Sequence, residues 1–136
     1  MKALLLALAG LSAAHAEPTG TLTLACQGTV TDSMRPDPKS EPISMGIVIN
    51  FDAQTVAGFD APSEVKILAV NEVTVRFGAN ARSASDPQFV EWIVGGTLDR
   101  TTGDVAAMSS AFDPKTRAPT VKRDFSLKCK PTQRMF

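Results

Sequence analysis

Two cysteines and one histidine are the side chains of this sequence most able to do chemistry at neutral pH. Cys26 and Cys129 are the only cysteines among 136 residues, and His15 is the only histidine. His15 lies inside a segment that reads as a cleavable export signal, so we expect the mature protein to lack an imidazole. Without an imidazole or a free thiol, most acid–base, nucleophilic and metal-binding chemistry is closed to the chain.

The first 16 residues have the parts of a secretory signal peptide. A short positive start is followed by an apolar run, residues 3–11, that is too short to span a bilayer. Ala14 and Ala16 occupy the A-x-A positions that signal peptidase reads, which predicts cleavage after Ala16. An amphipathic helix is the alternative, and the unbroken apolar block argues against it. The chain therefore divides into a signal peptide, residues 1–16, and a single β domain, residues 17–136, of a bacterial periplasmic or secreted protein.

The two cysteines are expected to form a disulfide. Exported compartments permit disulfides, and two cysteines allow only one intramolecular bridge. Strand alternation places Leu24 and Cys26 on one face near the start of the domain, and Leu127 and Cys129 on one face near its end. We therefore expect a bridge that joins the first and last strands. An intermolecular disulfide and two buried thiols are the alternatives.

The rest of the domain reads as strands and turns. Apolar and polar side chains alternate in residues 72–77, with Val73, Val75 and Phe77 expected to point inward, and Ala69 is expected to point inward on the preceding strand. Seven to nine strands at regular spacing predict an all-β fold, either a small antiparallel barrel or a β-sandwich. The barrel is preferred because it has no free edges and the bridge would tie its ends together.

Loops and irregular positions follow from proline and glycine. Residues 31–42 hold three prolines and form the longest predicted loop, a candidate for binding. Residues 78–87 are small and polar and form a second predicted loop. The pair Gly95-Gly96 inside the apolar strand 88–98 predicts a bulge or a bend.

Carboxylates are the remaining groups that could support catalysis. Asp99 and Asp104 flank a hairpin turn in which Gly103 is expected to be left-handed. They could hold a cation between them, although aspartates in such turns more often accept backbone hydrogen bonds. The sequence contains no calcium-loop, phosphate-loop or nucleophile-elbow motif. We therefore expect no enzymatic activity and no cofactor, with a carboxylate-based hydrolase as the alternative.

Two further groups of residues could bind a partner. Lys122, Lys128 and Lys130 share the outward face of the last predicted strand and form a candidate stripe for an anionic polymer, lipid headgroups or an acidic protein. The alternative is that these lysines only solvate the strand. Phe89 and Trp92 could wall a ligand cavity inside the barrel, or pack as ordinary core residues.

The C-terminal third carries a resemblance. The patterns GTLDRxTG, residues 96–103, and LxCKPxxRxF, residues 127–136, resemble the ending of small exported proteins of proteobacteria. This resemblance brings no activity with it. In size and cysteine placement the chain is also similar to bacterial inhibitors of c-type lysozyme, which insert a serine-bearing loop into the lysozyme cleft. Residues 108–112 are comparable to that loop only in their serines.

These observations favour a non-enzymatic binding or accessory protein of the cell envelope. An inhibitor of an envelope hydrolase, presenting the 31–42 or 108–119 loop, and a small-ligand carrier are the alternatives. Nucleic acid is not an expected partner, because the chain has no tyrosine and no aromatic stacking platform. The chain is not expected to span a membrane, since no segment after the signal is long and apolar enough and the strands are too short.

Overall fold

The computed structural model describes residues 17–132. Several predictions lie outside these residues: the signal peptide, its cleavage after Ala16, the place of His15, and the last residues of the C-terminal pattern, Arg134 and Phe136. Within the described residues the chain contains strands and turns and no helix.

Eight antiparallel strands, each hydrogen-bonded to its neighbour in sequence order, form a closed barrel. The predicted all-β barrel is therefore confirmed over its β-sandwich alternative. The strands are β1 (Thr21–Asp32), β2 (Ser40–Asn50), β3 (Thr55–Ala57), β4 (Val65–Val70), β5 (Thr74–Arg82), β6 (Val90–Asp99), β7 (Asp104–Phe112) and β8 (Pro119–Pro131).

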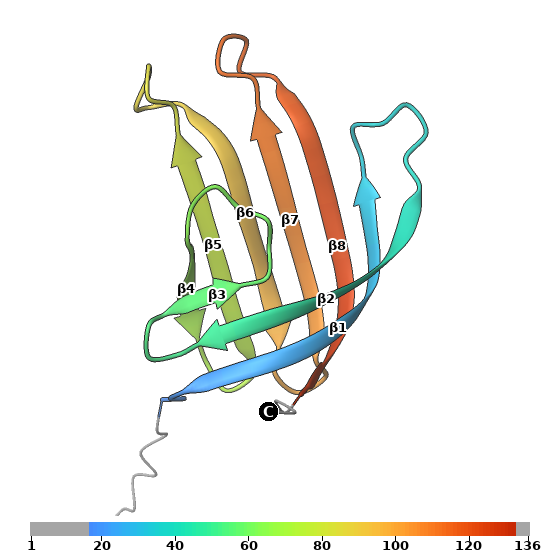
Figure 1. Cartoon of the computed structure of the whole chain (residues 1–136), viewed down its shortest axis with the longest axis vertical. Helices are drawn as coiled ribbons and strands as arrows, with labels where there is room; N and C mark the ends of the chain where they lie inside the picture. Colours follow the sequence, from blue (N-terminus) through green and yellow to red (C-terminus); the bar gives the residue numbers. More distant parts are fainter. Residues whose placement is uncertain (1–16, 133–136) are drawn as a thin grey trace, which may run out of the picture.

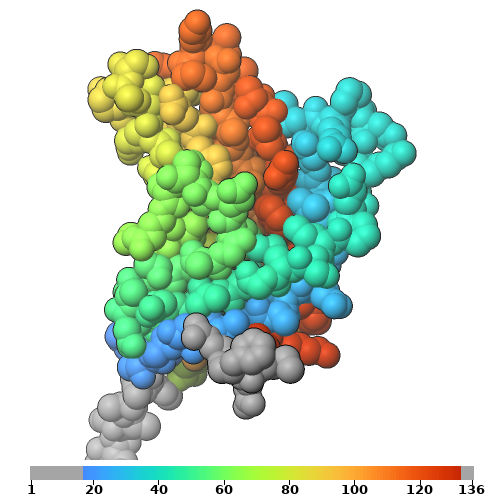
Figure 2. All heavy atoms as spheres, in the orientation of Figure 1, coloured from blue at the N-terminus to red at the C-terminus, as the bar shows by residue number. Residues whose placement is uncertain are grey.

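The barrel has a broad side and a crossing side. Strands β4 to β8 lie next to one another as one broad sheet, and β1 and β2 bend across it (Figure 1). Both ends of the described chain lie at one end of the barrel, and the loops 33–39, 83–89 and 113–118 project from the other (Figure 1). Loops 83–89 and 113–118 form one lobe, separated by a notch from loop 33–39 (Figure 2).

Strand alternation explains the core. Ile47, Ile49 and Val75 are at most 1% exposed, and their polar neighbours in sequence lie on the outside. Phe77 and Phe59 stack with ring centroids 5.3 Å apart, which extends the core toward the middle of the barrel. Because apolar burial is the main favourable term in folding, this filled interior is what holds the two sides of the barrel together.

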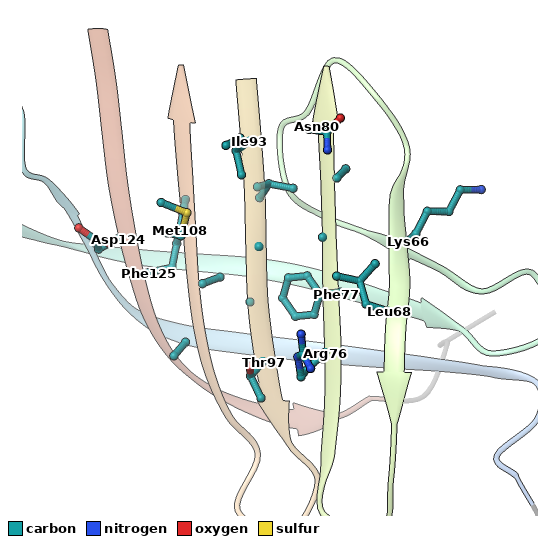
Figure 3. A pocket seen from close by; sticks show the side chains of 17 residues that line it. Lys66, Leu68, Arg76, Phe77, Asn80, Ile93, Thr97, Met108, Asp124 and Phe125 are labelled. Carbon is teal, nitrogen blue, oxygen red and sulfur yellow. The ribbon is translucent and has the colours of Figure 1, made fainter. Parts of the chain in front are cut away.

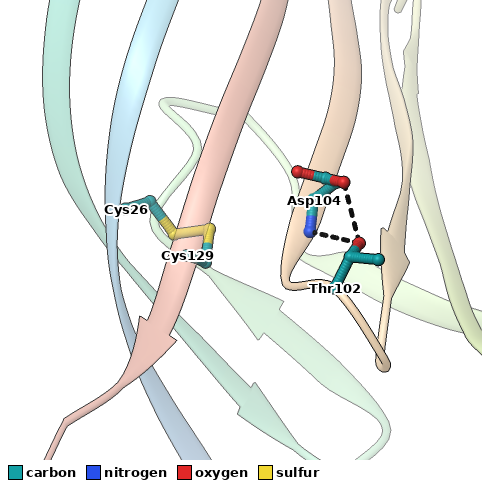
Figure 4. The surroundings of a disulfide bond; sticks show 4 residues. All are labelled: Cys26, Thr102, Asp104 and Cys129. Atoms are coloured by element: carbon teal, nitrogen blue, oxygen red, sulfur yellow. Dashed lines mark hydrogen bonds between the residues drawn. A yellow bond between two sulfur atoms is a disulfide. The ribbon is translucent and has the colours of Figure 1, made fainter.

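The disulfide joins the first and last strands, as predicted. β1 and β8 pair from Leu24 opposite Pro131 to Asp32 opposite Arg123, and within this ladder Cys26 lies directly opposite Cys129. Their sulfur atoms are 2.03 Å apart, and both cysteines are buried (Figure 4). The bridge therefore sits at the seam where the barrel closes.

Two predicted loops are shorter than expected. Strand β1 continues to Asp32 and β2 begins at Ser40, so residues 33–39 are the only part of the predicted 31–42 loop outside the strands. Strand β5 likewise continues to Arg82. In both places backbone hydrogen bonds to a neighbouring strand extend the ladder through small and polar residues, because pairing does not require apolar side chains.

The bulge predicted at Gly95-Gly96 was wrong. Both glycines keep a continuous register with β5 and β7, and Gly96 is required because a Cβ there would lie 2.5 Å from the ring of Phe77. The register instead shifts at three other places, where one residue is left without a partner. These residues are Leu68, Glu91 and Thr120.

Two inward predictions were also wrong. The extra residue Leu68 shifts the alternation of β4, so Ala69 becomes exposed. Val73 is 48% exposed, because it precedes β5 in the turn where Asn71 accepts hydrogen bonds from the backbone of Val73 and Thr74.

We predict that replacing both cysteines by alanine lowers the free energy of unfolding by about 4–5 kcal/mol in the chain-entropy model. The reason is that the bridge closes a loop between residues 103 positions apart and so restricts the unfolded chain. Urea unfolding of the oxidised protein and of the double variant measures the difference. Reduction of the wild-type protein should give the same loss, and equal midpoints before and after reduction would contradict the prediction.

A second prediction concerns the glycines with positive φ. Gly20 (φ +77°) has no atom within 4 Å of the position of a Cβ, whereas at Gly103 (φ +79°) a Cβ would lie 2.3 Å from the Cys129 carbonyl oxygen. Gly20→Ala should therefore cost only the left-handed backbone strain, about 1–2 kcal/mol, and Gly103→Ala clearly more. Thermal unfolding of the two variants tests this order, and equal losses would show that the contact with Cys129 relaxes freely.

Candidate functional site

Two hollows lie at opposite ends of the barrel. One of about 390 Å³ lies at the end where the described chain begins, and its wall includes Phe51, Val70 and Arg100. The other, of about 130 Å³, lies near the loop end between β1, β2 and β8. Its wall includes the charged residues Asp32, Arg35 and Arg123, with Ile43 and Phe125 beneath them. Pockets that enclose small molecules usually measure about 300–1,000 Å³, so the hollow at the loop end is small and the hollow at the other end is near the lower limit.

The two predicted cavity-wall residues lie at the loop end of β6 and in the loop before it. Trp92 is half-buried on β6, between Ala81 and Ala111 of the neighbouring strands, and packs against the core. Phe89 lies in loop 83–89 with the guanidinium of Arg117 5.1 Å from its ring centre. Neither residue lines the two hollows at the barrel ends or the larger hollow described below, so their role as a cavity wall stays a prediction.

The predicted lysine stripe is exposed but interrupted. Lys122, Lys128 and Lys130 all lie on the outer face of β8. The ammonium of Lys128 is 2.6 Å from a carboxylate oxygen of Asp104, and Asp124 lies between Lys122 and Lys128 on the same face. These two carboxylates lower the positive potential along the strand. An anionic partner would therefore find separate lysines and no continuous positive stripe.

The aspartates of the β6–β7 hairpin stabilise the turn. Asp99 Oδ1 accepts hydrogen bonds from the backbone N–H of Thr101 and Thr102, at 2.8 and 3.0 Å, and from the Thr101 hydroxyl at 2.6 Å. The Thr102 hydroxyl donates to Asp104 Oδ2 at 2.8 Å (Figure 4). Asp99 and Asp104 therefore stabilise the turn through these hydrogen bonds, which is a common structural role of aspartate in turns.

The hydrogen bonds also change the acidity of these groups. The Thr101 hydroxyl, with the backbone amides of Thr102 and Thr101, holds the pKa of Asp99 below its usual value of 3.8. The Lys128 ammonium and then the Thr102 hydroxyl lower the pKa of Asp104. Each of these interactions favours the charged carboxylate.

The largest hollow lies on the outer face of the broad sheet. It measures about 860 Å³ and extends across β4 to β8, where its residues are seen face-on in Figure 3. We call it the outer hollow. Its outward-facing lining residues are Lys66, Leu68, Arg76, Gly78, Asn80, Ile93, Gly95, Thr97, Ala106, Met108 and Asp124, and six residues at inward positions complete the lining.

One row of residues crosses all five strands of the outer hollow. Lys66 pairs with Gly78, Gly78 with Gly95, Gly95 with Met108, and Met108 with Asp124. All five face outward, because their neighbours in sequence point into the core. The row therefore reads, from β4 to β8, as a cation, two positions without side chains, an apolar side chain and an anion.

The paired glycines shape the centre of the outer hollow. Gly78 is buried beneath Leu68, whereas the backbone at Gly95 has no side chain over it. Leu68 is 61% exposed, and its Cδ1 lies only 3.1 Å from the position of a Cβ on Gly78. At Gly95 a Cβ would meet only the Phe77 carbonyl oxygen, at 3.8 Å, so a larger side chain fits there. The centre of the outer hollow is thus apolar and open.

The borders of the outer hollow carry charge. On the β4 border the ammonium of Lys66 forms an ion pair with the carboxylate of Glu64. On the β8 border Asp124 stands beside Lys122. Both borders therefore present one positive and one negative side chain beside the apolar centre.

The outer hollow combines an apolar centre with charged borders. A shallow apolar centre with charged borders resembles the anatomy of protein–protein interfaces, where an apolar centre is surrounded by a polar rim. Across residues 17–132 no group of three His, Cys, Asp or Glu side chains is placed to hold a metal ion. In the same residues no helix has the length and apolar character needed to cross a membrane.

Sequence reasoning missed the outer hollow. The sequence pattern predicts a bulge or a bend at Gly95 and a loop at Gly78. The available signal was their parity: each stands at an outward position of a strand, next to inward Phe77 or Val94. Two outward glycines lie side by side only if their strands are neighbours in the right register. The alternation of side chains along one strand does not reveal this register.

We predict that Asp99→Asn destabilises the protein at neutral pH and that the difference disappears well below pH 3.8. A lowered pKa in the folded state means that the charged carboxylate stabilises the fold above its ordinary pKa of 3.8, and that this contribution is lost as the pH falls through the lowered value. Urea midpoints of the variant and the wild type across this range measure the effect. Asp60→Asn, in the β3–β4 loop, is the control, and a difference that persists at the lowest pH would contradict the prediction.

Comparisons of the chain with protein-family models, with curated proteins and with solved structures found no match.

Proposed function

We propose that the chain is a non-enzymatic binding protein of the bacterial cell envelope, exported to the periplasm or beyond, and that it binds its partner through the outer hollow. The observation that carries this proposal is the place of the largest hollow: it lies on the outer face of β4 to β8, while apolar side chains fill the barrel interior. A molecule with this arrangement meets a partner by surface contact.

Two features support export. Residues 1–16 have the pattern of a signal peptide cleaved after Ala16. The buried Cys26–Cys129 disulfide is compatible with an oxidising compartment, where such bridges persist. Both features favour a working place outside the cytoplasm.

The surface of the outer hollow supports binding in its own right. Contiguous apolar surface with a polar rim commonly marks an interaction site on a monomer. Leu68 and Met108 give this surface its apolar side chains, and Gly95 gives it space into which a partner side chain can fit. A partner with a protruding apolar residue between charged ones matches it best.

The two alternative functions have less support. A carrier needs an enclosed cavity; the hollow of about 130 Å³ at the loop end is small, and the hollow of about 390 Å³ at the other end is at the lower limit of ligand pockets. For an inhibitor, the serine-bearing segment is part of β7, where Ser110 is 5% exposed and paired with β6 and β8. An inhibitory role would therefore depend on loops 33–39 and 113–118.

We predict that Gly95→Leu abolishes partner binding without unfolding the protein. The new side chain has room on the sheet and would occupy the centre of the outer hollow. Immobilised mature protein is incubated with envelope extract, and the proteins retained by the wild type and the variant are compared. A specific partner should be lost at least about tenfold in the variant.

Gly46→Leu is the matched control. Gly46 also faces outward, on β2, in a hollow of about 430 Å³ on the other side of the barrel, and a Cβ there meets only the Leu24 carbonyl oxygen at 3.9 Å. This variant should retain the partner. Equal retention by all three proteins, with equal unfolding midpoints, would remove the outer hollow as the binding site.

A further inference from the structure

We propose that the partner held in the outer hollow is a second copy of this chain, and that the two copies form a two-fold symmetric dimer through β4 to β8. This inference rests on the proposed function only in taking the outer hollow as the contact surface. It further identifies the partner as a second copy, and this identification follows from the order of charged and apolar residues across β4 to β8.

We call the row from Lys66 to Asp124 the central row. The charges and side-chain sizes along it are complementary to those of a second copy in the reverse order. β6 is the middle strand of the five, so Gly95 is the midpoint of the row, with Lys66 two strands away on one side and Asp124 two strands away on the other. A two-fold rotation about an axis along β6 in the interface exchanges the two sides. It places Lys66 of each copy opposite Asp124 of the other.

The same rotation brings apolar groups together. It exchanges β5 with β7, so that Met108 of one copy faces Gly78 and the Leu68 side chain that covers it on the other. Met108 is the one large side chain of the central row that is apolar, and methionine adapts readily to irregular gaps. Gly95 meets its own copy at the axis, where the absence of side chains allows the two sheets to approach closely.

The adjacent row repeats the complementarity. Asn80, Ile93, Ser110 and Lys122 are partners in the next row of outward positions, and Glu64 precedes Lys66 by two residues on the β4 border. The rotation brings Glu64 of one copy toward Lys122 of the other. It also brings the two copies of Ile93 together on the axis, which adds an apolar contact at the centre.

The remaining row introduces no opposition of like charges. There Arg76 pairs with Thr97, and Thr97 with Ala106. The rotation puts Arg76 of one copy opposite Ala106 of the other and places Thr97 on the axis. Since like charges across an interface are strongly unfavourable, these three rows, which avoid them on self-rotation, are suited to an isologous contact.

The ion pair between Lys66 and Glu64 is not an obstacle to this contact. Its two side chains are 54% and 59% exposed, and exposed pairs of this kind contribute little to stability. In the dimer each side chain exchanges a neighbour on its own chain for an opposite charge on the second copy.

Sedimentation equilibrium of the oxidised mature protein tests the proposal. The wild type should show a concentration-dependent dimer. Lys66→Glu and Asp124→Lys, made singly, should each raise the dimer dissociation constant by at least about tenfold, because every dimer contains the affected pair twice. The double variant, Lys66→Glu with Asp124→Lys, should dimerise as the wild type does, since the opposite charges face each other again.

Two further variants complete the experiment. Lys130→Glu, an exposed reversal on β8 that is not part of the outer hollow, should leave the dissociation constant unchanged. Gly95→Leu should give a monomer by a change that involves no charge, so it keeps the proposal testable if a charge variant fails to fold. Unfolding midpoints identify any variant that does.

The outcomes separate this inference from the proposed function. A wild-type protein that stays monomeric up to about 1 mM overturns the dimer. So does a double variant that remains as weak as the single ones. If the wild type is monomeric and Gly95→Leu still loses an envelope protein that Gly46→Leu retains, the binding surface stands and its occupant is a different protein. If neither the association nor the capture depends on Gly95, both proposals fail.

Discussion

The pairing of β1 with β8 is the constraint on which the rest of this structure depends. It converts a row of eight strands into a closed barrel, and Cys26 and Cys129 lie opposite each other within it. Without this seam both strands would expose a free edge, and the apolar face of the broad sheet would lose the cover that β1 and β2 give it. The packing of Ile47 and Ile49 against Val75 follows from closure, because these residues come from opposite sides of the barrel.

Much of the fold could be predicted because one periodicity governs it. In a strand, alternate residues point the same way, so Cys26 and Cys129 could be assigned to inward faces before their strands were known to be neighbours. The disulfide then restricted the topology, since an inward cysteine near each end is satisfied by a sheet that closes on itself. The same rule explains why Val75 and Phe77 were placed correctly in the core.

The errors arose where a neighbouring strand, more than the local sequence, determines the structure. Ala69 is exposed because Leu68 is an extra residue opposite β5. The sequence of residues 65–70 by itself does not predict this shift in register. The outer hollow was missed for a related reason. Its central row joins Lys66 to Asp124 through strands whose relative register is a property of the folded barrel, so the row cannot be read along the chain.

The position of the seam has a consequence for how such a molecule is made. The strand that completes the barrel is the last to be synthesised, and its partner is the first, so the final ladder and its bridge connect residues 103 positions apart. Contacts between distant parts of a chain form slowly, because the intervening loop must close before they are gained. A chain exported as proposed would therefore cross the membrane with its first strand unpaired on one side. Late closure of the barrel would keep the exported chain unfolded enough to pass through a translocation channel. Folding would then be completed in the compartment where the two cysteines can be oxidised.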